Sequence, residues 1–123
     1  MAKVDPQSAV PWDDRVVAEI LEDGYTQAVV VTDRSGGVVA WHGRERSRAS
    51  AGQRLDVLLA GLGHGGQELE LGTLRLAAVL YSGGTLVTAS DARYHFVLLA
   101  GPDANLGRLF SHARRLCAAA AGE

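Results

Sequence analysis

The stretch from Tyr94 to Ala121 constrains the fold more than any other part of the chain. It begins with a short apolar run, Tyr94–Ala100, which lacks the alternation of a strand wetted on one face. This run therefore predicts a central strand covered on both sides. Beyond Gly101-Pro102-Asp103, apolar residues recur at the 3.6-residue period of a helix that buries one stripe: Leu106, Leu109, Phe110, Ala113, Leu116, Cys117 and Ala120. A central strand that leads into an amphipathic helix predicts the core of the protein.

The rest of the chain predicts two more helices and four more strands. A helix is expected to start at Pro11–Asp14, where acidic residues favour the helix dipole, and to end before Gly24. A second helix is predicted at Ala51–Leu62, where leucines recur at helical spacing, with Gly61–Gly66 as a flexible exit. Runs rich in β-branched residues or bounded by glycine turns predict four strands: Thr26–Thr32, Val38–His42, Thr73–Tyr81 and Thr85–Ser90.

The element order α-β-β-α-β-β-β-α predicts one α+β domain that covers residues 11–121. Two hairpin units that flank a helix imply a five-stranded, mostly antiparallel sheet with helices on both faces. Residues 1–10 are polar or small and are expected to fray.

Composition argues against several classes of protein. A net charge of −2 is unsuited to a general nucleic-acid binder, which needs many uncompensated cations. The single cysteine, Cys117, excludes an internal disulfide and any multi-cysteine zinc site. No apolar run approaches the ~20 residues that span a bilayer, and the first residues lack the apolar core of a signal peptide. We therefore expect a cytoplasmic protein without a transmembrane segment.

No motif in the chain predicts a cofactor, a metal ion or a catalytic site. Gly61–Gly66 matches G-x-G-x-x-G, but it leaves a helix and approaches a strand, the reverse of the order that binds a pyrophosphate. No G-x-S-x-G elbow occurs, and His112 and Cys117 lie about 140° apart on one helix. The histidines belong to unrelated segments without ligand spacing: His42, His64, His95 and His112. We expect a protein that is not an enzyme.

One local concentration of positive charge lies in the connector before the second helix, at Arg44, Arg46 and Arg48. It is either a solvated loop or a docking patch for an acidic partner surface or a phosphate.

The predicted strand Thr73–Tyr81 is the feature that is hardest to account for if the protein is a monomer. Both of its flanks are apolar, so at a sheet edge it would expose unpaired backbone groups beside apolar side chains and invite pairing with another chain. The leucine helix before it could bury a surplus face in the same contact. We predict a symmetric homodimer with an interface built from both elements: Leu55, Leu59, Leu62, Leu74, Leu76, Ala77, Val79 and Tyr81.

Three stretches resemble the Roadblock/dynein-light-chain family, which includes bacterial regulators of small GTPases. They are Ala28–Ala40 with its Asp-Arg-Ser-Gly-Gly turn, Gly83–Ala89, and the strand-to-helix junction Leu98–Gly107. The resemblance implies a Roadblock/profilin-like fold without an active site, and a homodimer whose sheet continues across two chains. It also implies binding to a Ras-like small GTPase or another signalling complex. Some bacterial relatives speed GTP hydrolysis by reshaping the switch regions of the GTPase.

Two other classes of function stay open. A ligand-sensing domain of PAS or GAF type would need a cavity between the sheet and the helices, with a polar group to fix a ligand. A structural subunit of a larger complex would assemble without any dependence on nucleotide.

Overall fold

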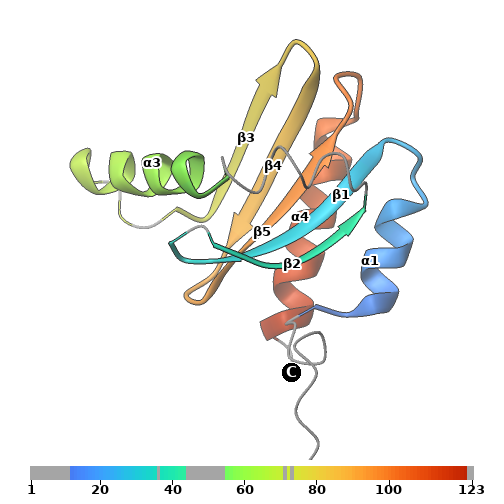
Figure 1. Ribbon diagram of the computed structural model, residues 1–123, viewed down its shortest axis with the longest axis horizontal. Helices are drawn as coiled ribbons and strands as arrows, with labels where there is room; N and C mark the ends of the chain where they lie inside the picture. The colour runs from blue at the N-terminus through green and yellow to red at the C-terminus, as the bar shows by residue number, and fades with distance from the viewer. Residues whose placement is uncertain (1–11, 36, 44–54, 71, 73, 122–123) are drawn as a thin grey trace, which may run out of the picture.

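The computed structural model describes residues 12–35, 37–43, 55–70, 72 and 74–121, apart from the side chains of residues 55, 56, 120 and 121. Its helices and strands follow the predicted order, as Figure 1 shows. The helices are α1 (Asp14–Leu21), α3 (Leu55–Glu68) and α4 (Leu106–Ala121). The strands are β1 (Thr26–Asp33), β2 (Val38–Gly43), β3 (Leu76–Tyr81), β4 (Gly84–Ser90) and β5 (Tyr94–Ala100).

The strands form one sheet in the order β2-β1-β5-β4-β3, and every pairing in it is antiparallel. Strand β5 lies at the centre, which confirms the prediction for Tyr94–Ala100. At the end of β2, Gly43 faces Ala28 with a φ of 140°, and a Cβ there would lie 2.4 Å from the carbonyl oxygen of Gln27. A glycine is therefore required where β2 leaves the sheet.

Helices α1 and α4 cover one face of the sheet. Val17 and Ile20 of α1 and Leu109, Ala113 and Leu116 of α4 are buried in one cluster with strand side chains of that face. Helix α4 lies over β4 and β5, and α1 lies over β1 (Figure 1). Because a packed helix is about 8–10 Å wide and strands lie about 4.8 Å apart, two helices cover about four strands. The outer strand β3 is left at the margin of this layer.

The other face of the sheet packs against the beginning of α3. Leu59 is buried there among Ala28, Val30, Leu86 and Val97, with Leu58 beside it. The rest of α3 extends away from the sheet, as Figure 1 shows. The two faces therefore carry helices in different ways, because α4 lies along its face whereas α3 touches its own face near one end.

The predicted flexible exit at Gly61–Gly66 is wrong, because these residues lie inside α3. No proline interrupts this segment, and each glycine costs a helix only about 1 kcal/mol relative to alanine. The positive φ values that end a helix occur later, at Glu70 (60°) and Gly72 (88°). The third strand begins at Leu76, later than the predicted start at residue 73. The predictions for residues 1–10 and 51–54 lie outside the described residues.

A buried polar cluster ties α4 to the corner between α1 and β1. Asp23 accepts hydrogen bonds from the amides of Tyr25 and Thr26 and from the Thr26 hydroxyl, at 2.9, 2.8 and 2.7 Å. The Nε2 atom of His112 lies 3.2 Å from the second carboxylate oxygen of Asp23. The side chain of His112 is buried on α4, where it pairs with Asp23.

Candidate functional site: an exposed edge strand and its neighbouring helix

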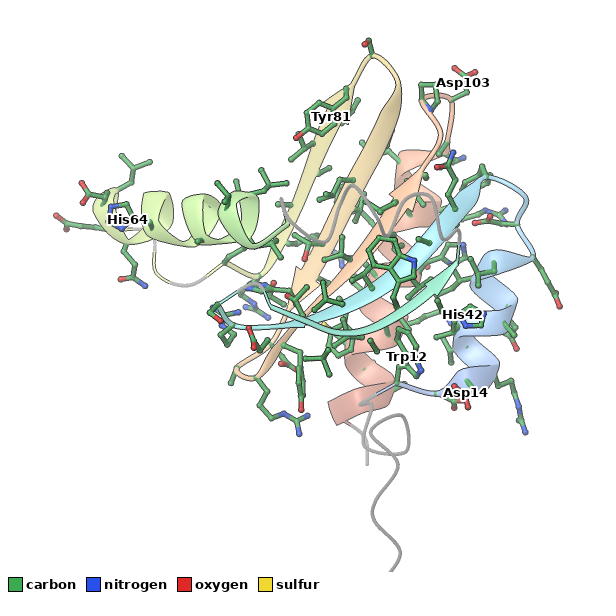
Figure 2. All side chains as sticks on the ribbon, in the orientation of Figure 1. Trp12, Asp14, His42, His64, Tyr81 and Asp103 are labelled. Atoms are coloured by element: carbon green, nitrogen blue, oxygen red, sulfur yellow. The ribbon has the colours of Figure 1, made fainter. Side chains whose placement is uncertain are left out.

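Strand β3 is an edge of the sheet, the position that the dimer prediction requires. It pairs with β4 along one side, and no strand in the described part of the chain pairs with its other side. Leu80 and Tyr81 are 67% and 56% exposed, and the four residues before them are half-buried. Figure 2 shows Tyr81 near the outer end of the strand. An apolar edge with free backbone groups is a surface that other chains pair with.

Helix α3 exposes apolar side chains beside this edge. Leu59 is buried, but Val57 is 72% exposed, and Leu69, the residue after the helix, is 71% exposed. Between them lie Gly61 and Gly65, where an added Cβ would have no atom within 4 Å. The helix backbone is therefore not covered by side chains at these two positions. His64, labelled in Figure 2, lies at the end of the helix that is far from the sheet. Small residues at such positions let another backbone approach closely.

The structure brings three of the predicted interface residues together. Leu62, Leu74 and Leu76 line a groove of about 580 Å³ between α3 and the start of β3, with Leu69 on the same wall. Leu59 and Val79 instead share the cluster on the second face of the sheet. Ala77 lies on that face by its register, and Tyr81 lies farther along the strand. Leu55 begins α3, but its side chain is outside the described set.

The arginine patch at Arg44, Arg46 and Arg48 lies outside the described residues. Its role as a docking surface therefore stays a prediction.

The histidines of the described segments have structural neighbours. His95 is buried, and its Nδ1 atom lies 2.5 Å from the Ser90 hydroxyl. Burial, with a smaller effect from the Arg34 charge, lowers the pKa of His95 and favours its neutral form. His64 is exposed and lies 3.3 Å from Glu68, one turn along α3. Within the described ranges, no three His, Cys, Asp or Glu side chains are grouped closely enough to hold a metal ion.

Sequence reasoning missed the contacts that join distant segments. Asp23 and His112 are separated by 89 residues, and neither carries a local motif that announces the pair. No sequence pattern predicted that Arg75 and Arg114 would line one groove with Cys117. Such placements depend on tertiary packing, which no local pattern in the sequence encodes.

The chain has the fold of solved Roadblock/LC7 domains. A Roadblock/LC7 domain from Streptomyces avermitilis has a TM-score of 0.68 and 17% identity, over 89% of this chain and 92% of that one. The gliding protein MglB of Thermus thermophilus has a TM-score of 0.65 and 23% identity, over 93% and 90%. MglB of Myxococcus xanthus has a TM-score of 0.68 and 14% identity, over 98% and 88%.

These likenesses lie in structure, because no protein-family model and no curated protein matches the sequence. None of the helices in the described part of the chain has the length and apolar character that crossing a bilayer requires.

Proposed function

We propose that this protein is a non-catalytic, homodimeric regulator or adaptor of a bacterial Ras-like small GTPase in the cytoplasm. The observation that carries the proposal is an apolar edge strand, β3, whose outer side pairs with no other described strand and which lies beside the projecting apolar helix α3. The proposal is also supported by the fold, which this chain shares with a Roadblock/LC7 domain and with MglB and MglC proteins. The sequence resemblance to a family of GTPase regulators points in the same direction.

The dimer is the first part of the proposal. Strand β3 contains neither proline nor lysine, the residues that natural proteins use to blunt an edge. Antiparallel pairing of β3 with its copy about a two-fold axis would satisfy its outward backbone groups and continue the sheet across both chains. The same symmetry would bring two α3 helices together, where Val57 and Leu69 would leave water. One MglB structure of this fold is described as having a tetrameric arrangement.

Regulation is the second part of the proposal. A binding partner can bias a GTPase only between states that it binds with different affinities. A GTPase-activating role would follow if the dimer binds the GTP form and holds its switch regions in the conformation that hydrolyses GTP. In this proposal, Arg44, Arg46 and Arg48 serve as a docking patch for an acidic surface of the partner.

Light scattering tests the dimer at high micromolar concentration. The proposal expects twice the chain mass of 13.0 kDa. A monomeric mass under these conditions would contradict it.

Affinity capture from the native lysate tests the regulatory role. The protein is immobilised, and the lysate is supplied in parallel with GDP or with a non-hydrolysable GTP analogue. We expect a small GTPase to be retained with one nucleotide in preference to the other. The retained GTPase is then purified, and its affinity, hydrolysis and exchange are measured with and without this protein. Equal affinity for both nucleotide forms, with unchanged hydrolysis and exchange, would rule out regulation.

A further inference from the structure

A second groove lies on the opposite face of the sheet, between α4 and the outer strands β3 and β4. Its volume is about 540 Å³. Leu76 and Ala89 line it from the strands, and Cys117 and Ala118 line it from α4. The groove exists because two helices are too narrow to cover five strands, so the space over β3 beside α4 stays open.

Two arginines stand at this groove, Arg75 before β3 and Arg114 on α4. Both side chains are exposed, and no carboxylate in the described segments forms an ion pair with either. The one acidic residue of the groove, Asp91, accepts hydrogen bonds from the amides of Arg93 and Tyr94 at 2.8 Å each. Its second oxygen lies 4.0 Å from the Arg93 guanidinium. The groove therefore has a net positive charge above an apolar lining.

We propose that this groove binds a small amphiphile with one anionic head group, a carboxylate or a phosphate, and an apolar tail. Guanidinium groups bind both head groups through paired, charge-assisted hydrogen bonds. The tail would lie against Leu76, Ala89 and Ala118 and remove apolar surface from water. The volume falls within the range of about 300–1,000 Å³ that is typical of small-molecule sites.

This groove borders the proposed dimer contact, because Arg75 and Leu76 line both this groove and the groove beside α3. Pairing of β3 with a second strand uses backbone groups in the plane of the sheet. The groove lies on the face that carries α4, whereas Leu59 of α3 packs on the other face. Residues of a single chain line the groove, so ligand binding can be measured whether or not a GTPase binds this protein.

Cys117 provides a reporter inside the groove. It is the only cysteine of the chain, and its side chain is half-buried. Burial, with a smaller effect from the Asp91 charge, raises the pKa of this thiol to about 11. Its reaction with a neutral maleimide is therefore slow enough to follow by mass spectrometry, since the thiolate is the reactive form.

The experiment measures the rate at which N-ethylmaleimide modifies Cys117 while decanoate is added below its micelle-forming concentration. We expect decanoate to slow the modification until the effect saturates. Decyltrimethylammonium has the same tail and the opposite charge, and it should give no protection. In an Arg75→Gln/Arg114→Gln double variant, the concentration for half protection should rise by at least about tenfold, as expected when charge-assisted hydrogen bonds are lost.

Arg108→Gln is the matched control, because Arg108 is an exposed arginine of α4 that does not line the groove. Its protection curve should equal that of the wild type, and all variants should unfold at the same temperature. Absence of saturable protection would overturn the proposal. Equal protection by the cationic amphiphile, or in the double variant, would also overturn it. If Cys117 does not react, calorimetric titration of decanoate into the same proteins decides between these outcomes.

Discussion

Helices α3 and α4 have similar lengths but differ in how they are held. Leu109, Ala113 and Leu116 of α4 are fully buried, and this helix also contacts α1. Helix α3 has fewer charged residues, yet Leu59 is its one fully buried apolar side chain among those described. Apolar sequence therefore does not by itself mark a core element. A helix that is apolar and poorly buried in its own chain is expected to complete its packing on another one.

The largest expected effect is a difference in how much a leucine-to-alanine substitution at each helix lowers the free energy of unfolding. Leu109→Ala in α4 removes a fully buried side chain from the core, and we expect it to lower the free energy of unfolding by about 2–5 kcal/mol. Leu69→Ala, at the residue that follows α3, is the matched change at a side chain that is 71% exposed, and it should alter monomer stability by less than about 0.5 kcal/mol. Urea unfolding at low protein concentration measures both values. Equal losses of unfolding free energy in the two variants would contradict the claim that α4 is held in the core and α3 is not.

The next effect concerns the edge beside α3. Tyr81→Asp places a charge on β3, and we expect self-association to weaken by at least about tenfold, which corresponds to 1.4 kcal/mol. Val39→Asp is the control, because Val39 is 44% exposed on β2 at the opposite edge. Sedimentation velocity over a range of concentrations measures both variants. A control that dissociates as readily as Tyr81→Asp would place the interface elsewhere.

A third effect tests the anchoring of α4 through its buried pair. Burial alone would raise the pKa of Asp23, but hydrogen bonds from Thr26 and Tyr25 and the charge of His112 lower it below 3.8. A carboxyl whose folded pKa is the lower one stabilises the protein above its unfolded pKa. That contribution is lost as the pH falls through the folded value. We therefore expect unfolding free energy to fall below about pH 4.

The variant Asp23→Asn should remove this part of the acid dependence. At neutral pH it should also cost about 1–3 kcal/mol, because hydrogen bonds to a buried charge are replaced by weaker ones. Urea unfolding between pH 3 and pH 7 gives both quantities. An unchanged acid slope in the variant would show that another group controls it.

The smallest effect concerns the glycines of α3. Gly61→Ala should raise monomer stability by about 0.5–1 kcal/mol, because alanine favours a helix interior and its Cβ would meet no atom within 4 Å. Gly43→Ala has the opposite expectation, since its Cβ would collide with the backbone of Gln27. Thermal unfolding compares the two. Destabilisation by Gly61→Ala would mean that α3 is packed more closely than its exposure indicates.

The sequence predicted the fold well where periodicity and turn residues act locally. The apolar run at Tyr94–Ala100 and the spacing of Leu109, Ala113 and Leu116 depend on burial within one element, and both predictions are confirmed. The prediction at Gly61–Gly66 was wrong, because α3 continues to Glu68 although its four glycines there together disfavour a helix by about 4 kcal/mol.

The candidate site was predictable only in part. The sequence predicted that the strand ending at Tyr81 would invite pairing with another chain if it lay at a sheet edge. The structure places it at an edge. By contrast, the pairing of Asp23 with His112 and the position of Arg75 and Arg114 on one groove depend on the relative placement of distant elements, which no local pattern encodes.

Hydrogen exchange of the two sheet edges tests the central claim most directly. Backbone amide exchange is measured by mass spectrometry at low and at high micromolar concentration, with β2 as the internal reference for β3. If β3 pairs with its copy, its amides should become more protected as concentration rises, while those of β2 keep the same rates. Exchange of β3 that does not depend on concentration, in a chain that stays at 13.0 kDa, would contradict the account.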